Sequence, residues 1–333
     1  MERNYKTIFI IINIIFVFSL IIIPTSIIYT KFVNLGRIDK TLTYKYSSET
    51  PPFKKDLNLI TDVGIIDIKY TTQQVDYLVK IDVDIELAGP NLNGKSYLDV
   101  FDINWENSTS PLNFNLELIP NMLAEFSNLQ NFNVKIDVSL RADIVFDINA
   151  STVDGTIGLT NLMSITVSNL YLKVERGNIN YDSTNCTIEG NITGIVNNGD
   201  ITLKSYNNQF TQNSKFTIKN VKGYVLIDIY QYEEMGANVT GTAITETGII
   251  RINYKDVSSN VGARFVFYNK NTFGPETETI WIGFNADILP SEDGLLLVSY
   301  DFPTKNNYNF SLYKFSTTSG DFHFDLYSFP ITA

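Results

Sequence analysis

One stretch of the chain matches the pattern of a nucleotide-binding loop. Residues Gly89–Ser96, Gly-Pro-Asn-Leu-Asn-Gly-Lys-Ser, satisfy G-x-x-x-x-G-K-[ST], in which backbone amides cradle phosphates and the lysine reaches them. Such a loop works when it opens a helix whose N-terminus faces the anion. Here Tyr97 to Ile103 have the alternation of a strand, and Pro90 beside asparagine is typical of a turn. The sequence therefore predicts a surface loop that binds no nucleotide.

Histidine and cysteine offer little material for catalysis or metal binding, since the chain has one of each. His323 alternates with phenylalanines, which predicts an outward, solvated side chain between Asp321 and Asp325. No G-x-S-x-G elbow accompanies it, and the usual zinc sites need more Cys and His ligands. Cys186 is predicted to be a small packed or partly exposed residue, with an intermolecular disulfide as the alternative.

Carboxylates are the remaining candidates for chemistry. Asp82, Asp84 and Glu86 project from one face of a predicted strand at intervals of about 7 Å, too far apart to share one calcium ion without other strands. They are expected to form a solvated face that aids solubility and protects a sheet edge. We therefore assign no catalytic, cofactor-binding or metal-binding residue, and we predict that the protein is not an enzyme.

An apolar segment near the N-terminus is predicted to anchor the chain in a membrane. Residues 7–30 carry no charge and contain sixteen Ile, Leu, Val or Phe residues in twenty-four, enough for a transmembrane helix of roughly 36 Å. The alternative, a cleaved signal peptide, would have a shorter apolar core and a small-residue cleavage site. Residues 1–6 then form a cytosolic tail. The flanking lysines and arginines favour the opposite orientation, but long domains translocate largely regardless of such charges, so we expect the C-terminal domain to be extracytoplasmic.

The overall charge limits the partners of that domain. The chain has 36 acidic and 25 basic residues and a net charge of −11. Binding to nucleic acid needs a concentrated basic surface, which this composition argues against. An anionic lipid surface would repel the same charge, so only residues 7–30 are expected to contact the bilayer.

Beyond the anchor the chain divides into four predicted regions. Residues 31–55 are mixed and polar, as in a stalk or linker. Residues 56–140 form an N-terminal β region, in which strands show apolar residues at every second position. Residues 141–256 carry an internal repeat, and the aromatic-rich residues 257–333 form a C-terminal β cap region.

The repeat consists of a turn residue, a glycine and alternating apolar positions. The glycines are 22, 22, 24 and 25 residues apart, a spacing typical of stacked coils with one continuous core. The predicted fold is therefore all-β, with a single-stranded parallel β-helix or solenoid after the helix; the alternative is an antiparallel β-sandwich. Glycine suits each turn because positive φ costs it nothing. The repeat glycines are Gly155, Gly177, Gly199, Gly223 and Gly248, and similar fragments that could be end coils lie at Gly64, Gly294 and Gly320.

About half of the chain resembles a known family. The opening Leu57–Ile68 and the repeated glycine units between Gly155 and Ile252 resemble the putative-adhesin family of prokaryotic surface proteins, which includes LiaG-like proteins. The resemblance implies a β-solenoid after an N-terminal membrane segment. Most members have no established activity, and no functional residue is implied. Residues 88–130 and those after Asp256 depart from the pattern.

These observations predict a membrane-anchored, non-catalytic surface-binding or adhesin-like module of unknown ligand. Its 19 Tyr and 22 Phe residues supply aromatic faces for a surface protein or glycan, although most are expected in the core. One alternative is a regulatory or assembly partner of another envelope protein. Another is a polysaccharide-active β-helix enzyme, which would need two or more carboxylates about 5 to 10 Å apart in a groove.

Overall fold

The computed structural model of the chain is built almost entirely of β-strands. It describes residues 35–71, 75–90, 92–108, 110–120, 129–256, 261–269, 277–282, 286–291, 294–299, 304–314 and 322–327. Within these ranges no helix has the length and apolar character needed to cross a bilayer. The predicted tail at residues 1–6 and the predicted anchor at residues 7–30 lie outside them.

The described strands fall into three groups along the chain. The first group is β1 (Leu35–Tyr46), β2 (Lys54–Thr71), β3 (Val79–Pro90), the 3-10 turn η1 (Tyr97–Asp99), β4 (Phe101–Glu106), β5 (Leu112–Leu118) and β6 (Asn131–Arg141). The repeat region contains β7 (Val145–Met163), β8 (Thr166–Val167), β9 (Leu170–Thr184), β10 (Thr187–Ile188), β11 (Ile192–Asn198), β12 (Ile201–Tyr206), β13 (Gln209–Phe210), β14 (Ser214–Gln231) and β15 (Val239–Asp256). The last group is β16 (Gly262–Asn269), β17 (Thr277–Ile282), β18 (Ala286–Ser291), β19 (Gly294–Ser299), β20 (Asn307–Lys314) and β21 (Phe322–Tyr327).

Hydrogen bonding joins eighteen of the described strands into one large mixed sheet, and β8, β10 and β13 form a second, three-stranded one. The chain divides into two compact units. Unit 1 comprises Met1–Lys40, Asp84–Asp102 and Leu118–Asn133. Unit 2 comprises Thr41–Val83, Ile103–Glu117 and Val134–Ala333.

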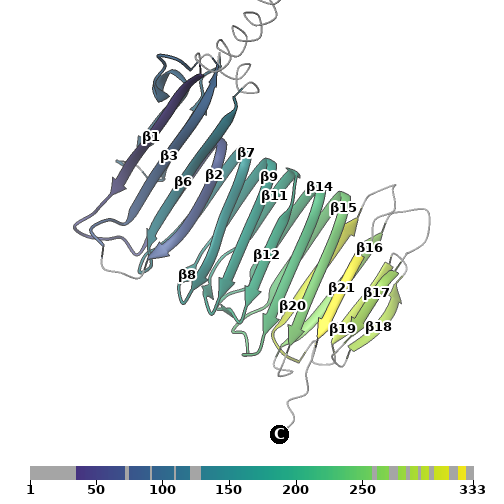
Figure 1. The fold of residues 1–333 in the computed structure, drawn as a ribbon. Helices are drawn as coiled ribbons and strands as arrows, with labels where there is room; N and C mark the ends of the chain where they lie inside the picture. Colours follow the sequence, from purple (N-terminus) through teal and green to yellow (C-terminus); the bar gives the residue numbers. More distant parts are fainter. Residues whose placement is uncertain are drawn as a thin grey trace, which may run out of the picture. The chain divides into compact units, whose positions relative to one another are not determined.

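The glycine repeat forms a ladder of parallel strands in unit 2. β2, β7, β9, β14 and β15 lie side by side, with β11 and β12 paired between β9 and β14 (Figure 1). Every one of these pairs is parallel, which is not the pairing of an antiparallel sandwich. The fragment at Gly64 joins the ladder directly, because Gly64 is opposite Gly155 despite the long intervening segment.

Rows of apolar side chains fill the interior of the ladder. Because side chains alternate along each strand and the strands are in register, every second position of one strand meets the same kind of residue on the next. One such row is at most 1% exposed along its whole length. It consists of Ile66, Ile157, Ile179, Ile201, Val225 and Ile250.

The repeat glycines stack directly on one another. Gly177 has φ +131°, and a Cβ placed there would lie 1.7 Å from the carbonyl oxygen of Gly155. The same approach to the preceding repeat glycine recurs at 1.8 to 2.0 Å at Gly155, Gly199, Gly223 and Gly248. The repeat therefore needs glycine for two reasons. Glycine adopts the positive φ without strain, which confirms the prediction at Gly177, and no side chain fits between the stacked turns.

Besides the glycine turn, each of three successive repeats has a second turn, formed by a residue other than glycine. Ser164, Asn185 and Asn207 have φ between 50° and 53°, a conformation that asparagine tolerates better than most residues. Each is followed by a two-residue strand, and the three short strands pair in parallel as β8, β10 and β13. The chain thus changes direction at the same place in successive repeats.

One region differs from the predicted division. Residues 31–55 were expected to be a stalk, but β1 begins at Leu35 and β2 begins at Lys54. The segment was judged by its polar composition, and the alternation of side chains along β1 was missed. Tyr44 of this strand packs edge-on against Phe114, with ring centroids 5.7 Å apart.

The C-terminal region, predicted to be a β cap or a separate small β layer, contains strands of two kinds. β20 and β21 continue the parallel ladder beside β15. The fragment at Gly294, for which an end coil was one interpretation, begins β19, which pairs antiparallel with β16 and β18. Gly320, the other fragment of this kind, lies outside the described residues.

Candidate binding groove

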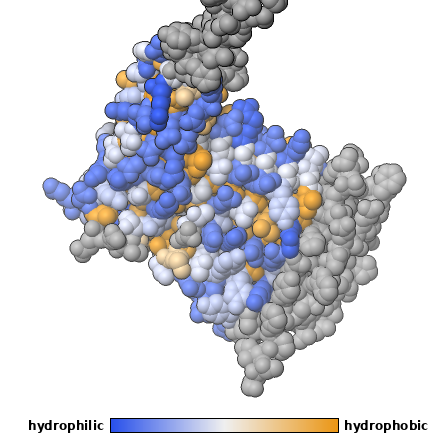
Figure 2. Space-filling view, viewed as in Figure 1, coloured by the Kyte–Doolittle hydropathy of each residue, from blue (hydrophilic) through white to orange (hydrophobic). Residues whose placement is uncertain are grey.

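A groove of about 600 Å³ opens on the outer side of the ladder in unit 2. Its walls come from β9, β12, β14 and β15 and from the residues that follow them. The lining consists of Thr184, Asn185, Tyr206, Asn207, Asp228, Tyr230, Tyr232, Arg251, Asn253, Tyr254 and Lys255. More widely, polar residues dominate the described surface in Figure 2, with apolar residues scattered among them.

The register of the ladder gathers these side chains from distant parts of the sequence. Tyr206 of β12 is opposite Thr184 of β9 and Tyr230 of β14, and Tyr230 is opposite Lys255 of β15. Each of the four lies seven residues after a repeat glycine. Asp228 and Asn253, five residues after theirs, are also opposite each other and share the outward face because side chains alternate.

Three tyrosine rings form the aromatic part of the groove. The rings of Tyr206 and Tyr230 meet edge to face, with centroids 6.4 Å apart and planes at 83°. The ring of Tyr232 is tilted by 54° against Tyr230 at 5.7 Å, and this residue is 39% exposed. The Lys255 ammonium lies 4.9 Å from the centroid of the Tyr230 ring, a cation–π contact. All three rings thus contact neighbours, and Tyr232 is also exposed to solvent in part.

Polar groups beside the rings are oriented by hydrogen bonds. The Tyr206 hydroxyl donates to Asp228 Oδ2 at 2.7 Å. Burial raises the pKa of Tyr206 above its ordinary value, and the hydrogen bond to the Asp228 carboxylate raises it further, so this phenol remains a neutral donor. Arg251 Nε donates to Asn253 Oδ1 at 3.1 Å, which orients a guanidinium and an amide in the same groove.

The asparagines of the second turn build one edge of the groove. Asn207 Nδ2 donates to Asn185 Oδ1 at 2.9 Å, and Asn207 Oδ1 accepts from the Glu233 amide at 3.1 Å. Asn207 is buried, so its side chain links two adjacent repeats to the segment after β14. These hydrogen bonds hold one edge of the groove in place.

The described lining supplies binding groups more readily than a hydrolytic pair. Asp228 is the only carboxylate among the described lining residues, whereas glycoside hydrolysis ordinarily uses two. A search of the described part of the chain finds no group of three or more His, Cys, Asp or Glu side chains that could hold a metal ion. What the lining offers is aromatic stacking and directed hydrogen bonds.

The loop that matches the nucleotide-binding pattern has a different local structure. β3 ends at Pro90, and the Lys95 amide donates to the Leu92 carbonyl in a turn. The Ser96 amide and hydroxyl donate to Asp99 Oδ2 at 2.7 and 2.9 Å, and both bonds lower the pKa of Asp99. The expectation of a strand from Tyr97 was wrong, because these bonds cap the three-residue 3-10 turn η1 and β4 starts only at Phe101.

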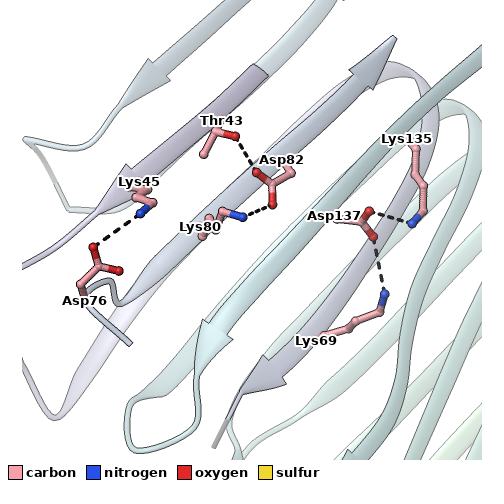
Figure 3. Close-up of polar contacts among 8 residues, drawn as sticks. All are labelled: Thr43, Lys45, Lys69, Asp76, Lys80, Asp82, Lys135 and Asp137. Atoms are coloured by element: carbon pink, nitrogen blue, oxygen red, sulfur yellow. Dashed lines mark hydrogen bonds and ion pairs between the residues drawn. The ribbon is translucent and has the colours of Figure 1, made fainter. Parts of the chain in front are cut away.

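The predicted acidic strand face is more enclosed than expected. Asp82 accepts one hydrogen bond from Thr43 Oγ1 at 2.7 Å and forms an ion pair with Lys80 at 2.5 Å (Figure 3). Thr43 belongs to β1, the segment expected to be a stalk, which explains why Asp82 is not simply solvated. Asp84 and Glu86 are also half-buried on β3. A similar cluster places Asp137 between Lys135 at 2.7 Å and Lys69 at 3.6 Å (Figure 3).

Cys186 is buried, as expected for a small packed residue. It is 1% exposed, and its thiol donates to the carbonyls of Leu162 and Thr184 at 3.2 and 3.5 Å. Burial raises the pKa of this thiol, which opposes reaction and intermolecular pairing. The backbone of His323 lies in β21 opposite Arg251; its side chain is outside what the structure describes.

Sequence reasoning did not single out the groove residues. Their signal was present as a constant offset from each repeat glycine, at five and seven residues. Using it requires the strands to be aligned glycine to glycine, which is a property of the ladder. Tyr232 lies beyond the strands of the repeat and has no such signal.

No protein-family model matches this sequence, and no curated protein does either. Several solved structures are similar at low sequence identity. A putative cell adhesion protein from Clostridium sporogenes is 11% identical, with a TM-score of 0.36 and coverage of 86% of this chain and 99% of that one.

Two further structures come from Parabacteroides. A putative adhesin from Parabacteroides merdae has 11% identity and a TM-score of 0.32, covering 88% of this chain and 97% of its own. A putative lipid binding protein from Parabacteroides distasonis has 10% identity and a TM-score of 0.29, covering 88% and 98%. At these TM-scores the likenesses carry no assignment, and the resemblance to LiaG-like proteins remains a prediction.

Proposed function

We propose that the protein is a membrane-anchored, non-catalytic binding module that holds a ligand at the cell surface. The observation that carries the proposal is the groove, in which tyrosine rings lie beside polar groups already oriented by Asp228 and Asn253. Preorganised side chains of this kind lose little conformational entropy when a ligand binds. That the described lining residues include one carboxylate, Asp228, supports binding over hydrolysis.

In this proposal the parallel ladder closes into a β-solenoid. Three features support it: the in-register strands from β2 to β15, the stacked glycines, and the second parallel sheet of β8, β10 and β13. A solenoid presents side chains of successive coils in fixed rows, so a ligand meets a rigid surface. Such a scaffold suits a surface-binding role of the type predicted from the putative-adhesin resemblance.

The location of the domain follows from the apolar segment. Residues 7–30 are proposed to cross the cell membrane once, with the tail at residues 1–6 in the cytosol and the C-terminal domain outside. Protease treatment of intact cells tests this, with a tag at the C-terminus. We expect the tag to be lost from intact cells, and a protected tag that is lost only after lysis would refute the orientation.

Binding is tested with the full chain in detergent and envelopes isolated from cells that lack the protein. We expect saturable binding that Tyr230→Ala weakens at least tenfold, because the ring that packs against both Tyr206 and Tyr232 is lost. Tyr171→Ala is the matched control, since Tyr171 is an exposed tyrosine on β9 outside the groove. Equal binding by both variants and the parent chain would contradict a role for the groove.

A further inference from the structure

We infer that the groove takes a carbohydrate chain, an inference that rests on the binding function proposed above. The groove crosses β9, β12, β14 and β15. Adjacent strands are about 4.8 Å apart, so the row from Thr184 to Lys255 extends for about 14 Å. That length suits several linked sugar rings better than one small molecule.

The tyrosines provide the surfaces on which sugar rings stack. The face of an aromatic ring is electron-rich, so it attracts the C–H groups on the flat side of a sugar. Tyr232 presents such a ring to solvent, and Tyr230 fixes its tilt. Lys255 covers part of Tyr230, so Tyr232 is assigned the stacking role and Tyr230 the role of its support.

Planar polar groups next to the rings match neighbouring hydroxyls. A carboxylate accepts two or more hydrogen bonds, and a guanidinium donates several in a fixed geometry. Asp228 keeps acceptor capacity after its bond from Tyr206, and the Arg251 guanidinium, oriented through Asn253, is a donor group of the same groove. Hydroxyls on adjacent sugar carbons both donate and accept, so they are complementary to this mixed set.

Other classes of ligand fit the groove less well. A peptide that adds a strand to a sheet needs an open edge, but β12 and β14 are each paired on both sides. An extended lipid chain needs an apolar cavity, whereas the large apolar surfaces among the described lining residues are tyrosine rings set beside polar groups. Binding of nucleic acid is unfavourable, because the net charge of −11 repels its phosphates.

The test compares envelopes treated in two ways as probes for the full chain, purified in a detergent without a sugar head group. Periodate cleaves adjacent diols in glycans to aldehydes, which borohydride then reduces to alcohols, while protease digestion removes envelope proteins. We expect periodate treatment to reduce binding at least tenfold and protease treatment to leave it within twofold. Loss of binding with protease but not with periodate would overturn the carbohydrate assignment and leave the binding function standing. No binding to untreated envelopes would refute both.

Variants then locate the interaction. Tyr232→Ala is expected to weaken binding at least tenfold, whereas Tyr232→Phe, which keeps the ring, stays within about threefold. Asp228→Asn removes the charge with little change in shape and is expected to weaken binding about tenfold. Far-UV circular dichroism and unfolding midpoints matching the parent chain exclude misfolding. Undiminished binding by Tyr232→Ala would overturn the assigned stacking role.

Discussion

Replacing one stacked glycine tests the physical basis of the ladder. In Gly177→Ala, the new methyl carbon would lie 1.7 Å from the Gly155 carbonyl oxygen, whereas real Cβ contacts stay above about 3.0 Å. The neighbouring strands would have to separate by more than 1 Å at this point. The backbone would also hold alanine at φ +131°, a conformation that residues with a side chain rarely adopt.

The expected loss can be estimated from these two effects. An unfavourable φ costs about 1–3 kcal/mol, and separating the strands weakens hydrogen bonds worth about 1 kcal/mol each. Gly177→Ala should therefore lower the free energy of unfolding by about 3–5 kcal/mol. The mechanism is local and steric, so the same loss is expected at Gly199 and Gly223, where the distances are 1.9 and 2.0 Å.

Gly158→Ala provides the matched control, because it makes the same chemical change in the same ladder. Gly158 has no positive φ, and its new Cβ would meet nothing closer than Asp67 Oδ1 at 3.5 Å. At such a site alanine stabilises by about 0.4–1 kcal/mol by restricting the unfolded chain. Urea unfolding of the full chain in detergent, followed by tryptophan fluorescence, measures both variants. Equal unfolding midpoints for Gly177→Ala and Gly158→Ala would refute the stacking argument.

Three further predictions concern buried and charged groups. The Cys186 thiol should react with a thiol reagent at least about 100-fold more slowly in the native chain than in urea, because burial shields it and raises its pKa; equal rates would show that it is accessible. Burial opposes ionisation of Asp147, but hydrogen bonds from Lys54, Ser168 and the Asn169 amide lower its pKa. Its contribution to stability is therefore full above the ordinary carboxyl pKa of about 4 and is lost as the pH falls through the lower folded value, so unfolding midpoints of Asp147→Asn should vary less with acid than those of the parent chain. Asp137→Asn should cost less than about 1 kcal/mol, since its lysine partners are 41% and 53% exposed; a loss above 2 kcal/mol would show a stronger network.

Local patterns were enough to identify the β class and the repeat. Alternation of apolar and polar residues predicted strands because its period matches the pleat. Glycines spaced 22 to 25 residues apart predicted stacked turns, and they are opposite one another in neighbouring parallel strands. The same reasoning missed β1, since its residues were judged by polarity rather than by their period of two. It left the role of Gly294 open, because a turn followed by a strand does not specify which partner the strand takes.

The position of the groove could not be predicted from the sequence, because it depends on the register between paired strands. Tyr206, Asp228 and Lys255 are far apart in the chain, and each is an ordinary outward residue in its own strand. Only the pairing of β12, β14 and β15 brings them together and orients Tyr206 toward Asp228. Which side chains face outward is set within a few residues by backbone alternation, so it can be predicted from local sequence. Which outward side chains become neighbours depends on hydrogen bonds between strands that are distant in the chain, and this decided where the candidate site lies.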